Sequence, residues 1–220
     1  MPHWLMVVSW LAIILGVLTA TVIAFDEVAH PQHMKIMNVV WPVTGLYVPV
    51  IGWWAYTGLG RPKLALAHST PAKNEFWRSV FVSSTHCASG CVIGDIIGAP
   101  IVFAAGWTLF GQRLFADYVV LFALAFIFGI AFQYLAIREV RRVSPRMALV
   151  DALKADTLAL TAFEVGLFAW MAVMYFLFVP QPEPTSAYYW FLMQIGMVLG
   201  FITTYPANWL LVKWGVKAGM

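Results

Sequence analysis

Charged residues are scarce in this chain. Asp, Glu, Lys and Arg make up 10% of the 220 residues, against ~25% in a typical soluble domain. With 62% of the residues hydrophobic, the expected solvent is lipid and the expected partner is the bilayer. The 2 cysteines are too few for a disulfide framework. The chain also lacks a phosphate-binding glycine loop, H-E-x-x-H, G-x-S-x-G and the C-x-x-C-H haem motif, which leaves these enzyme classes and haem without support.

Six apolar segments predict an all-α transmembrane bundle of about six spans, forming one integral membrane domain over residues 1–220. The segments are 4–25, 37–58, 79–110, 115–137, 157–179 and 187–212. The first helix, within residues 1–25, has no Lys or Arg before it and is long enough to span, so a retained helix is favoured over a signal peptide. Pro42 and Pro49 predict a kink in the second segment, and the length of the third predicts a tilt or a break near Pro100.

The basic residues predict an orientation. All but two of the 13 lie on one side of a six-span bundle. They fall in 59–78 (Arg61, Lys63, Lys73 and Arg78), in 138–156 and in the tail, whereas the alternate loops carry Lys35 and Arg113. The positive-inside rule makes the basic side cytoplasmic. Both termini are then cytoplasmic, the loops 26–36, 111–114 and 180–186 face outward, and a bacterial inner membrane is the expected location. The same rule explains where the basic residues lie, so nucleic-acid binding is not needed to account for them.

The stretch "SPRMALVDALKAD" (144–156) carries a serine in N-cap position and a proline at the first helical position. It predicts a short amphipathic helix on the cytoplasmic surface.

The third segment contains "SSTHCASGCVIGDIIGAP" (83–100), which places unusual residues in an apolar helix. Spacing by four puts polar side chains on one stripe of the helix, namely Cys87, Cys91 and Asp95. The adjacent stripe carries His86 and three small residues, Gly90, Gly94 and Gly98, which allow another helix to approach closely. Packing explains the glycines, and buried free cysteines are often small hydrophobic residues. An ionisable group inside a span, however, is a functional candidate.

Two chemistries compete for the cysteines. Side chains at i and i+4 have Cβ atoms about 5–6 Å apart, whereas a disulfide needs about 3.5–4.5 Å. The spacing therefore favours a soft-metal site with His86, Cys87 and Cys91 as ligands. Thiolates select Cu(I), and zinc is the less favoured ion.

Further candidate ligands are methionines and one histidine. Met193 and Met197 lie one turn apart on the sixth segment, and Met34 and Met37 follow His30 in the segment expected outside. Methionine on a membrane helix is more often core filler than ligand.

The remaining polar residues predict a ladder across the bilayer. Asp95 and Glu164 lie inside spans, and Asp156 and Asn208 lie near the inner boundary. Such ladders suit ion or proton passage, and these residues are candidates to relay protons or support the ligands. A hydrogen-bonded network that fixes helix packing is the competing explanation.

Four stretches resemble an uncharacterised family of bacterial and archaeal membrane proteins, catalogued as domain of unknown function 4396. They are "HPQHMKIMNVVWPVTGLYVP" (30–49), "HCASGCVIGD" (86–95), "ALKADTLALTAFEVG" (152–166) and "ITTYPANWLLVKWGVK" (202–217). The resemblance covers residues 30–217 and implies a polytopic membrane protein. It marks as motif positions His86, Cys87, Cys91, Asp95, Asp156 and Glu164, together with His30, Met34 and Met37, but implies no activity.

The favoured function is binding or transport of a soft metal ion, copper first, at the third segment. One alternative is a membrane thiol-disulfide oxidoreductase that uses Cys87 and Cys91, with a quinone as a candidate partner. The other is a structural subunit whose face of Gly90, Gly94 and Gly98 binds a second copy or another membrane protein. A role without catalysis is favoured, and an enzymatic one stays open.

Overall fold

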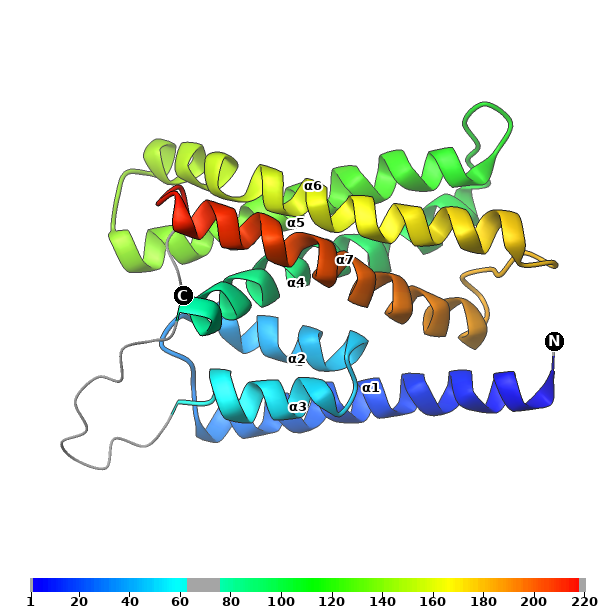
Figure 1. The fold of residues 1–220 in the computed structure, drawn as a ribbon, viewed down its shortest axis with the longest axis horizontal. Helices are drawn as coiled ribbons and strands as arrows, with labels where there is room; N and C mark the ends of the chain where they lie inside the picture. Colours follow the sequence, from blue (N-terminus) through cyan, green and yellow to red (C-terminus); the bar gives the residue numbers. More distant parts are fainter. Residues whose placement is uncertain (1, 63–75, 218–220) are drawn as a thin grey trace.

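The computed structural model describes residues 2–62 and 76–217, and their elements are all helical (Figure 1). The order is α1 (His3–Ala29), α2 (Met37–Tyr47), α3 (Ile51–Ala55), the π-helical turn η1 (Tyr56–Gly60), α4 (Phe76–Ala105), α5 (Arg113–Arg141), α6 (Pro145–Leu177) and α7 (Ala187–Lys213). Within the described residues, 5 helices are long and apolar enough to cross a membrane, namely α1, α4, α5, α6 and α7. The expected helical bundle is therefore present, with five candidate spans among the described residues in place of the six expected.

The missing span is the second apolar segment, which folds as a hairpin. α2 ends at Tyr47, Val50 has a φ of 63°, and α3 and η1 then run back beside α2 (Figure 1). A Cβ on Gly52 would lie 2.9 Å from Gly45 Cα, so the absence of side chains lets the two arms touch. Irregular backbone is tolerated at membrane depth only where protein shields it. α1 and α4 both pack against α2, whereas Val50 and Ile51 at the turn are exposed.

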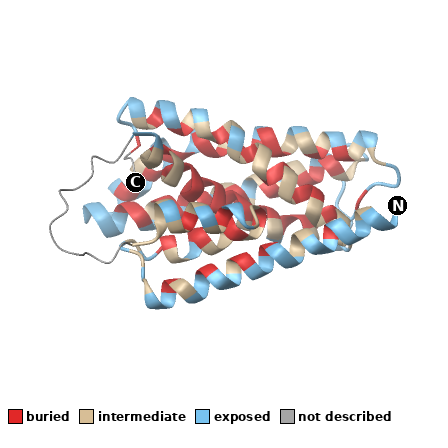
Figure 2. Ribbon diagram, turned by 60° about the horizontal axis from the view of Figure 1, so that its bottom comes forward, coloured by how far each residue is buried: buried red, intermediate tan, exposed pale blue. Residues whose placement is uncertain are grey.

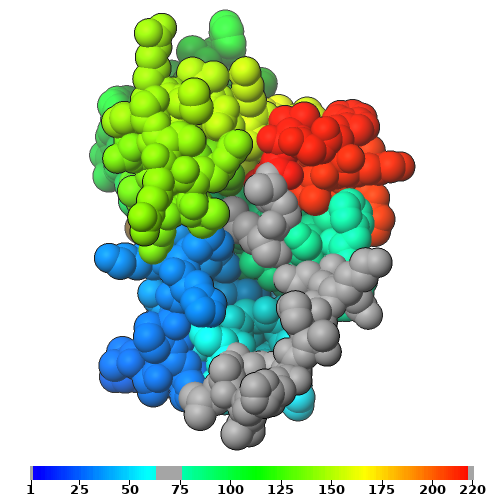
Figure 3. All heavy atoms as spheres, turned by 90° about the vertical axis from the view of Figure 1, so that its left-hand side faces the viewer, coloured from blue at the N-terminus to red at the C-terminus, as the bar shows by residue number. Residues whose placement is uncertain are grey.

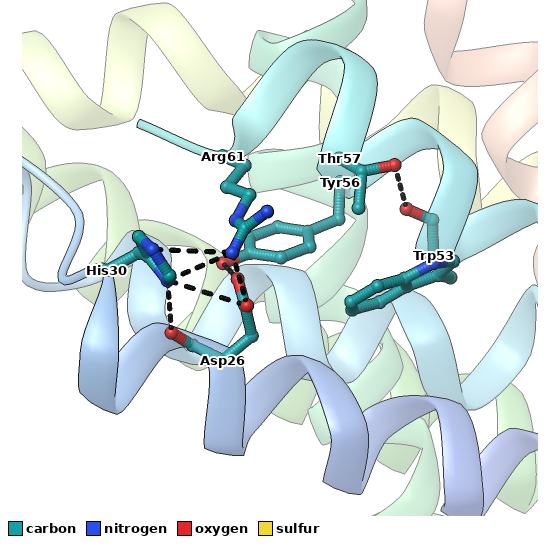
Figure 4. Close-up of polar contacts among 6 residues, drawn as sticks. All are labelled: Asp26, His30, Trp53, Tyr56, Thr57 and Arg61. Carbon is teal, nitrogen blue, oxygen red and sulfur yellow. Dashed lines mark hydrogen bonds and ion pairs between the residues drawn. The ribbon is translucent and has the colours of Figure 1, made fainter. Parts of the chain in front are cut away.

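The hairpin is fastened to α1 where it returns to its starting end (Figure 4). Arg61 Nη2 donates to Asp26 Oδ1 at 2.8 Å, and the Tyr56 hydroxyl donates to Asp26 Oδ2 at 2.7 Å. The His30 ring lies 3.2 Å from the Arg61 guanidinium through Nδ1. One carboxylate at the end of α1 thus holds the exit of the hairpin.

A hairpin in place of a span changes the topology. α1 begins at the end of the bundle opposite to that where α7 finishes (Figure 1). The prediction that residues 26–36 face away from the basic segments is wrong, because Asp26 pairs with Arg61 and the Lys35 N–H donates to Glu139 Oε2 at 3.0 Å. Figure 3 looks onto this end, where the blue loop, the yellow-green α5–α6 connection and the red end of α7 gather. We call it the basic end.

Among the basic residues that the structure describes, Arg113 alone lies at the opposite end, at the start of α5. Lys63 and Lys73 lie outside the described residues. The five-span arrangement thus segregates charge more fully than the six-span one, because Lys35 now joins the basic end.

We expect the two termini on opposite sides of the membrane, with the end of α7 in the cytoplasm under the positive-inside rule. Fusing a reporter that is active only outside the cytoplasm to each terminus measures this. Activity at the N-terminus and none at the C-terminus is the expected pattern. Equal reporter activity at the two termini would contradict this arrangement, because it requires an even number of spans.

α4 lies at the centre of the bundle and packs against α2, α5, α6 and α7. It is the most buried of the five candidate spans and α1 is the least, as the pale-blue helix below the N label shows in Figure 2. α4 runs unbroken through Pro100, so the predicted break is absent. The glycine stripe faces α5: a Cβ on Gly90 would lie 2.6 Å from Gly129 Cα, and one on Gly94 would lie 2.6 Å from Ala125 Cα. This close contact is made within the chain.

The surface helix predicted at 144–156 is not a separate element. Its N-cap is as expected, since the Ser144 hydroxyl accepts from the Met147 N–H at 3.4 Å and Pro145 opens the helix. The helix then continues without interruption to Leu177. The amphipathic stretch is therefore the first part of α6, and Asp156 is carried into the bundle.

Candidate functional site

α4 brings its polar stripe into the middle of the bundle. The side chains of His86, Cys87, Cys91 and Asp95 are all fully buried. They are buried because α5, α6 and α7 surround this part of α4. The sequence places them on one helix, and the neighbouring helices supply the groups around them.

The two thiols and one carboxyl form the centre of the site. Cys87 and Cys91 are free cysteines, and the Cys91 thiol faces both the Cys87 thiol and the Glu164 carboxyl of α6. Asp95 lies within electrostatic reach of Glu164 and Cys91. Tyr47, at the end of α2, brings its hydroxyl toward both thiols from the turn of the hairpin.

The carboxyls are short of partners. Neither oxygen of Asp95 and neither oxygen of Glu164 has a hydrogen-bond partner in the described part of the chain. Burying an unpaired polar group is costly, and a carboxyl inside a span more so. Asp95 and Glu164 are therefore candidate functional residues.

Toward the basic end lies a hydrogen-bonded cluster in which the predicted candidates Asp156 and Asn208 are joined by Lys217, which was not predicted. Lys217 Nζ donates to Asp156 Oδ1 at 2.7 Å and to Asn208 Oδ1 at 2.9 Å. Asn208 Nδ2 donates to the Thr204 carbonyl at 3.1 Å, and the Thr204 hydroxyl donates to the carbonyl of Ala159 at 2.6 Å. Burial lowers the pKa of Lys217, whereas the Asp156 carboxylate and the two thiols raise it, and the net shift is upward. The ammonium therefore stays charged at neutral pH.

Toward the other end, the series of polar groups continues. Tyr189 of α7 lies within electrostatic reach of Asp95 on one side and Asp117 on the other. Arg113 Nε lies 3.7 Å from Asp117 Oδ2. Tyr189 and Asp117 were not predicted.

Ionisable groups within electrostatic reach of one another thus run from the basic end to the opposite end. We call this series the polar row, and its members in order are Lys217, Asp156, His86, Cys87, Cys91, Glu164, Asp95, Tyr189, Asp117 and Arg113.

Three predicted ligands lie elsewhere. His30, Met34 and Met37 were expected at an outer mouth, but they lie at the basic end. His30 contacts Asp26 and Arg61, and both methionines pack in an apolar cluster to which α1, α2, η1 and α5 contribute. Their positions follow from the hairpin, which turns the preceding loop back to the end it started from.

The sixth-segment methionines are closer to the thiols. Met193 and Met197 of α7 are buried in the same hydrophobic core as Cys87 and Cys91. Met197 also lines a cavity of about 180 Å³ together with Tyr47, Ile96 and Gln194.

The three-ligand metal site predicted from the sequence is not assembled. Within residues 2–62 and 76–217, no three His, Cys, Asp or Glu side chains converge enough to hold an ion. His86 is the ligand that is missing: its ring lies 6.1 Å from the Phe132 ring between centroids, and neither of its nitrogens has a hydrogen-bond partner there. The adjacent stripes of α4 point the imidazole toward α5 and the thiols toward Glu164 on α6.

Comparison with known proteins identifies a family but no activity. A family model described as "Domain of unknown function (DUF4396)" matches residues 76–217, from the start of α4 to Lys217. The match covers well over half of the chain, and it leaves out α1 and the hairpin. No curated protein and no solved structure matches the chain.

Proposed function

The chain belongs to the DUF4396 family, whose description carries no activity, and from its site we propose that it carries a soft monovalent cation, Cu(I) first, across the membrane through the bundle of α4 to α7. The observation that supports this proposal is the polar row. A packed core of this size needs no ionisable group, and each one inside a span is costly. A series reaching from end to end is typical of a pathway.

The thiol pair at the middle of the row favours a soft cargo. Thiolates select Cu(I) among the common metal ions. Cu(I) accepts two sulfur ligands, whereas a structural Zn(II) site takes four ligands. Cys87 and Cys91 offer two sulfurs on successive turns, and His86 does not join them as a third ligand, so the site suits copper better than zinc. Met193 and Met197 are thioether groups in the same core as the thiols, and we propose that they assist transfer.

The carboxyls have a role in this scheme. A thiol must lose its proton to bind metal. Glu164 faces Cys91, and Asp95 is the next carboxyl along the row. They are the neighbouring groups that can accept protons from the thiols as the cation binds and return them when it leaves.

The purified protein in detergent is expected to bind a single Cu(I) ion per chain. Replacing both cysteines, Cys87→Ser with Cys91→Ser, is expected to abolish this binding because it removes both sulfur ligands. Metal analysis after desalting, under reducing conditions, measures the stoichiometry. The matched control is His33→Ala, which removes an exposed histidine remote from the site and should leave the stoichiometry unchanged.

Two results would speak against the proposal. One is a folded wild-type protein that retains no Cu(I). The other is retention that survives loss of both cysteines.

A thiol oxidoreductase is the second candidate, and the cavity beside Tyr47 favours it. The cavity is lined almost entirely by apolar side chains, with Gln194 as a polar exception. Tyr47 lines it and also lies within electrostatic reach of both thiols. A quinone in that cavity would take two electrons and two protons as the dithiol closes to a disulfide. Thiol trapping in cells tests this: a Cys87–Cys91 disulfide that forms and is reduced again favours this function over cation transport.

A further inference from the structure

Lys217 stands out because a lysine just beyond the end of a helix is normally solvated. Its side chain is fully buried and is paired with a fully buried Asp156. The ammonium contacts two oxygens, one on Asp156 and one on Asn208. No other lysine in the described part of the chain is classed as buried.

The local backbone accounts for this position. α7 ends in a Schellman motif, in which the Val216 N–H donates to the Leu211 carbonyl at 3.0 Å and the Gly215 N–H donates to the Val212 carbonyl at 3.1 Å. Gly215 has a φ of 69°, which a glycine adopts without strain. The motif reverses the chain, so the Lys217 side chain reaches back into the bundle.

The oxygens around the ammonium can accept further hydrogen bonds. Asp156 Oδ2 has no hydrogen-bond partner among the described residues, and it is fully buried. A Cβ on Gly129 would lie 3.5 Å from this oxygen, and Gly129 also packs against Gly90 on α4. Asp156 is therefore level with the turn of α4 that carries the thiol pair.

The ammonium also lies within electrostatic reach of His86, Cys87 and Cys91. Since its backbone is at the basic end, the side chain extends from that end toward the thiols. The Lys217 side chain thus lies in the polar row between the basic end and the thiols.

We propose that Asp156 and Asn208 form a second cation-binding site, for a monovalent cation, and that Lys217 is its built-in occupant, which closes the basic end of the polar row. Two oxygens, one anionic, bind the tethered ammonium as they would a free ammonium ion. Release requires Val216 and Lys217 to swing away, which breaks the hydrogen bonds from their N–H groups to the Leu211 carbonyl but leaves α7 intact up to Lys213. The closing role rests on the proposed cation pathway, whereas the site itself does not.

Removing the tethered cation tests the site directly. In Lys217→Ala the site becomes available to a soluble cation, so the protein is expected to gain stability in ammonium chloride over choline chloride at equal ionic strength. The expected rise in Tm is roughly 3–8 °C at saturating ammonium. The wild type and Lys217→Ala with Asp156→Asn are the matched controls, and neither should respond to the choice of cation.

If Lys217→Ala folds only when ammonium is present, the site is supported equally. If it folds and its Tm is the same in both salts, the site is refuted. Copper is absent from this measurement, so failure of the cation site and failure of the copper proposal can be told apart.

The closing role is tested in Lys217→Ala with Asp156→Asn, which carries no unpaired buried charge and should fold. A small cationic methanethiosulfonate reagent is applied from the side where α7 ends. Labelling of Cys87 and Cys91 is expected to be at least tenfold faster than in the wild type, because the ammonium no longer blocks and repels the reagent. Equal labelling rates in the two folded proteins would refute the closing role.

Discussion

Replacing Lys217 by Met is expected to lower the free energy of unfolding by about 3–5 kcal/mol, the usual cost of leaving one member of a buried ion pair alone. Asp156 would lose its cationic partner in a site with no exposed surface. Asn208 would lose its donor, since Oδ1 receives a hydrogen bond from the ammonium. Unfolding in mixed micelles by titration with a denaturing detergent measures the change.

The double variant Lys217→Met with Asp156→Asn is expected to recover most of that loss. Neutral residues of similar size in place of a buried ion pair often cost little. Lys213→Met is the control, because it removes an exposed lysine from the last turn of the same helix and should change stability by less than about 0.5 kcal/mol. Equal stability of Lys217→Met and Lys213→Met would contradict the buried ion pair.

The length and spacing of the apolar segments predicted much of the fold. Five of the six apolar segments form helices long and apolar enough to span a membrane, because a run of about 20 apolar residues in lipid has few alternatives to a helix. The α4 stripe was also readable, since spacing by four determines which side chains share a face. Its glycines face α5 through Gly129 and Ala125, which spacing alone does not identify.

The hairpin was not readable from length and hydropathy. Residues 37–58 are as long and apolar as a span, and Pro49 indicated only a kink. Whether this segment forms a hairpin or a span depends on contacts between separate parts of the chain, such as Gly45 with Gly52 and Asp26 with Arg61. Once the hairpin replaced a span, the side expected for His30, Met34 and Met37 reversed with it.

Lys217 was misread for a similar reason. In sequence it is one more basic residue in a polar tail, which the positive-inside rule explains without further meaning. Its partner Asp156 is 61 residues away. Gly215 before it was the available signal, because a glycine just past a helix end predicts a reversal of the chain.

The largest functional effect is expected from the thiol pair. With Cys87→Ser and Cys91→Ser, the cation would meet hydroxyls, which remain protonated and are poor ligands for a soft ion. The structural cost is small, since serine is similar in size to cysteine and both sites lie beside polar groups. We therefore expect a folded protein whose transport rate falls at least tenfold, a change of about 1.4 kcal/mol or more in the barrier.

Uptake of Cu(I) into proteoliposomes tests the pathway most directly. Purified protein is reconstituted, Cu(I) is supplied outside with a reductant, and an impermeant Cu(I) indicator inside reports entry. Saturable uptake by the wild type and by His33→Ala, with at least a tenfold slower rate in the double serine variant, is the predicted result. Uptake by the wild type no faster than by protein-free vesicles, or equal uptake by the serine variant, would contradict transport through the thiol pair.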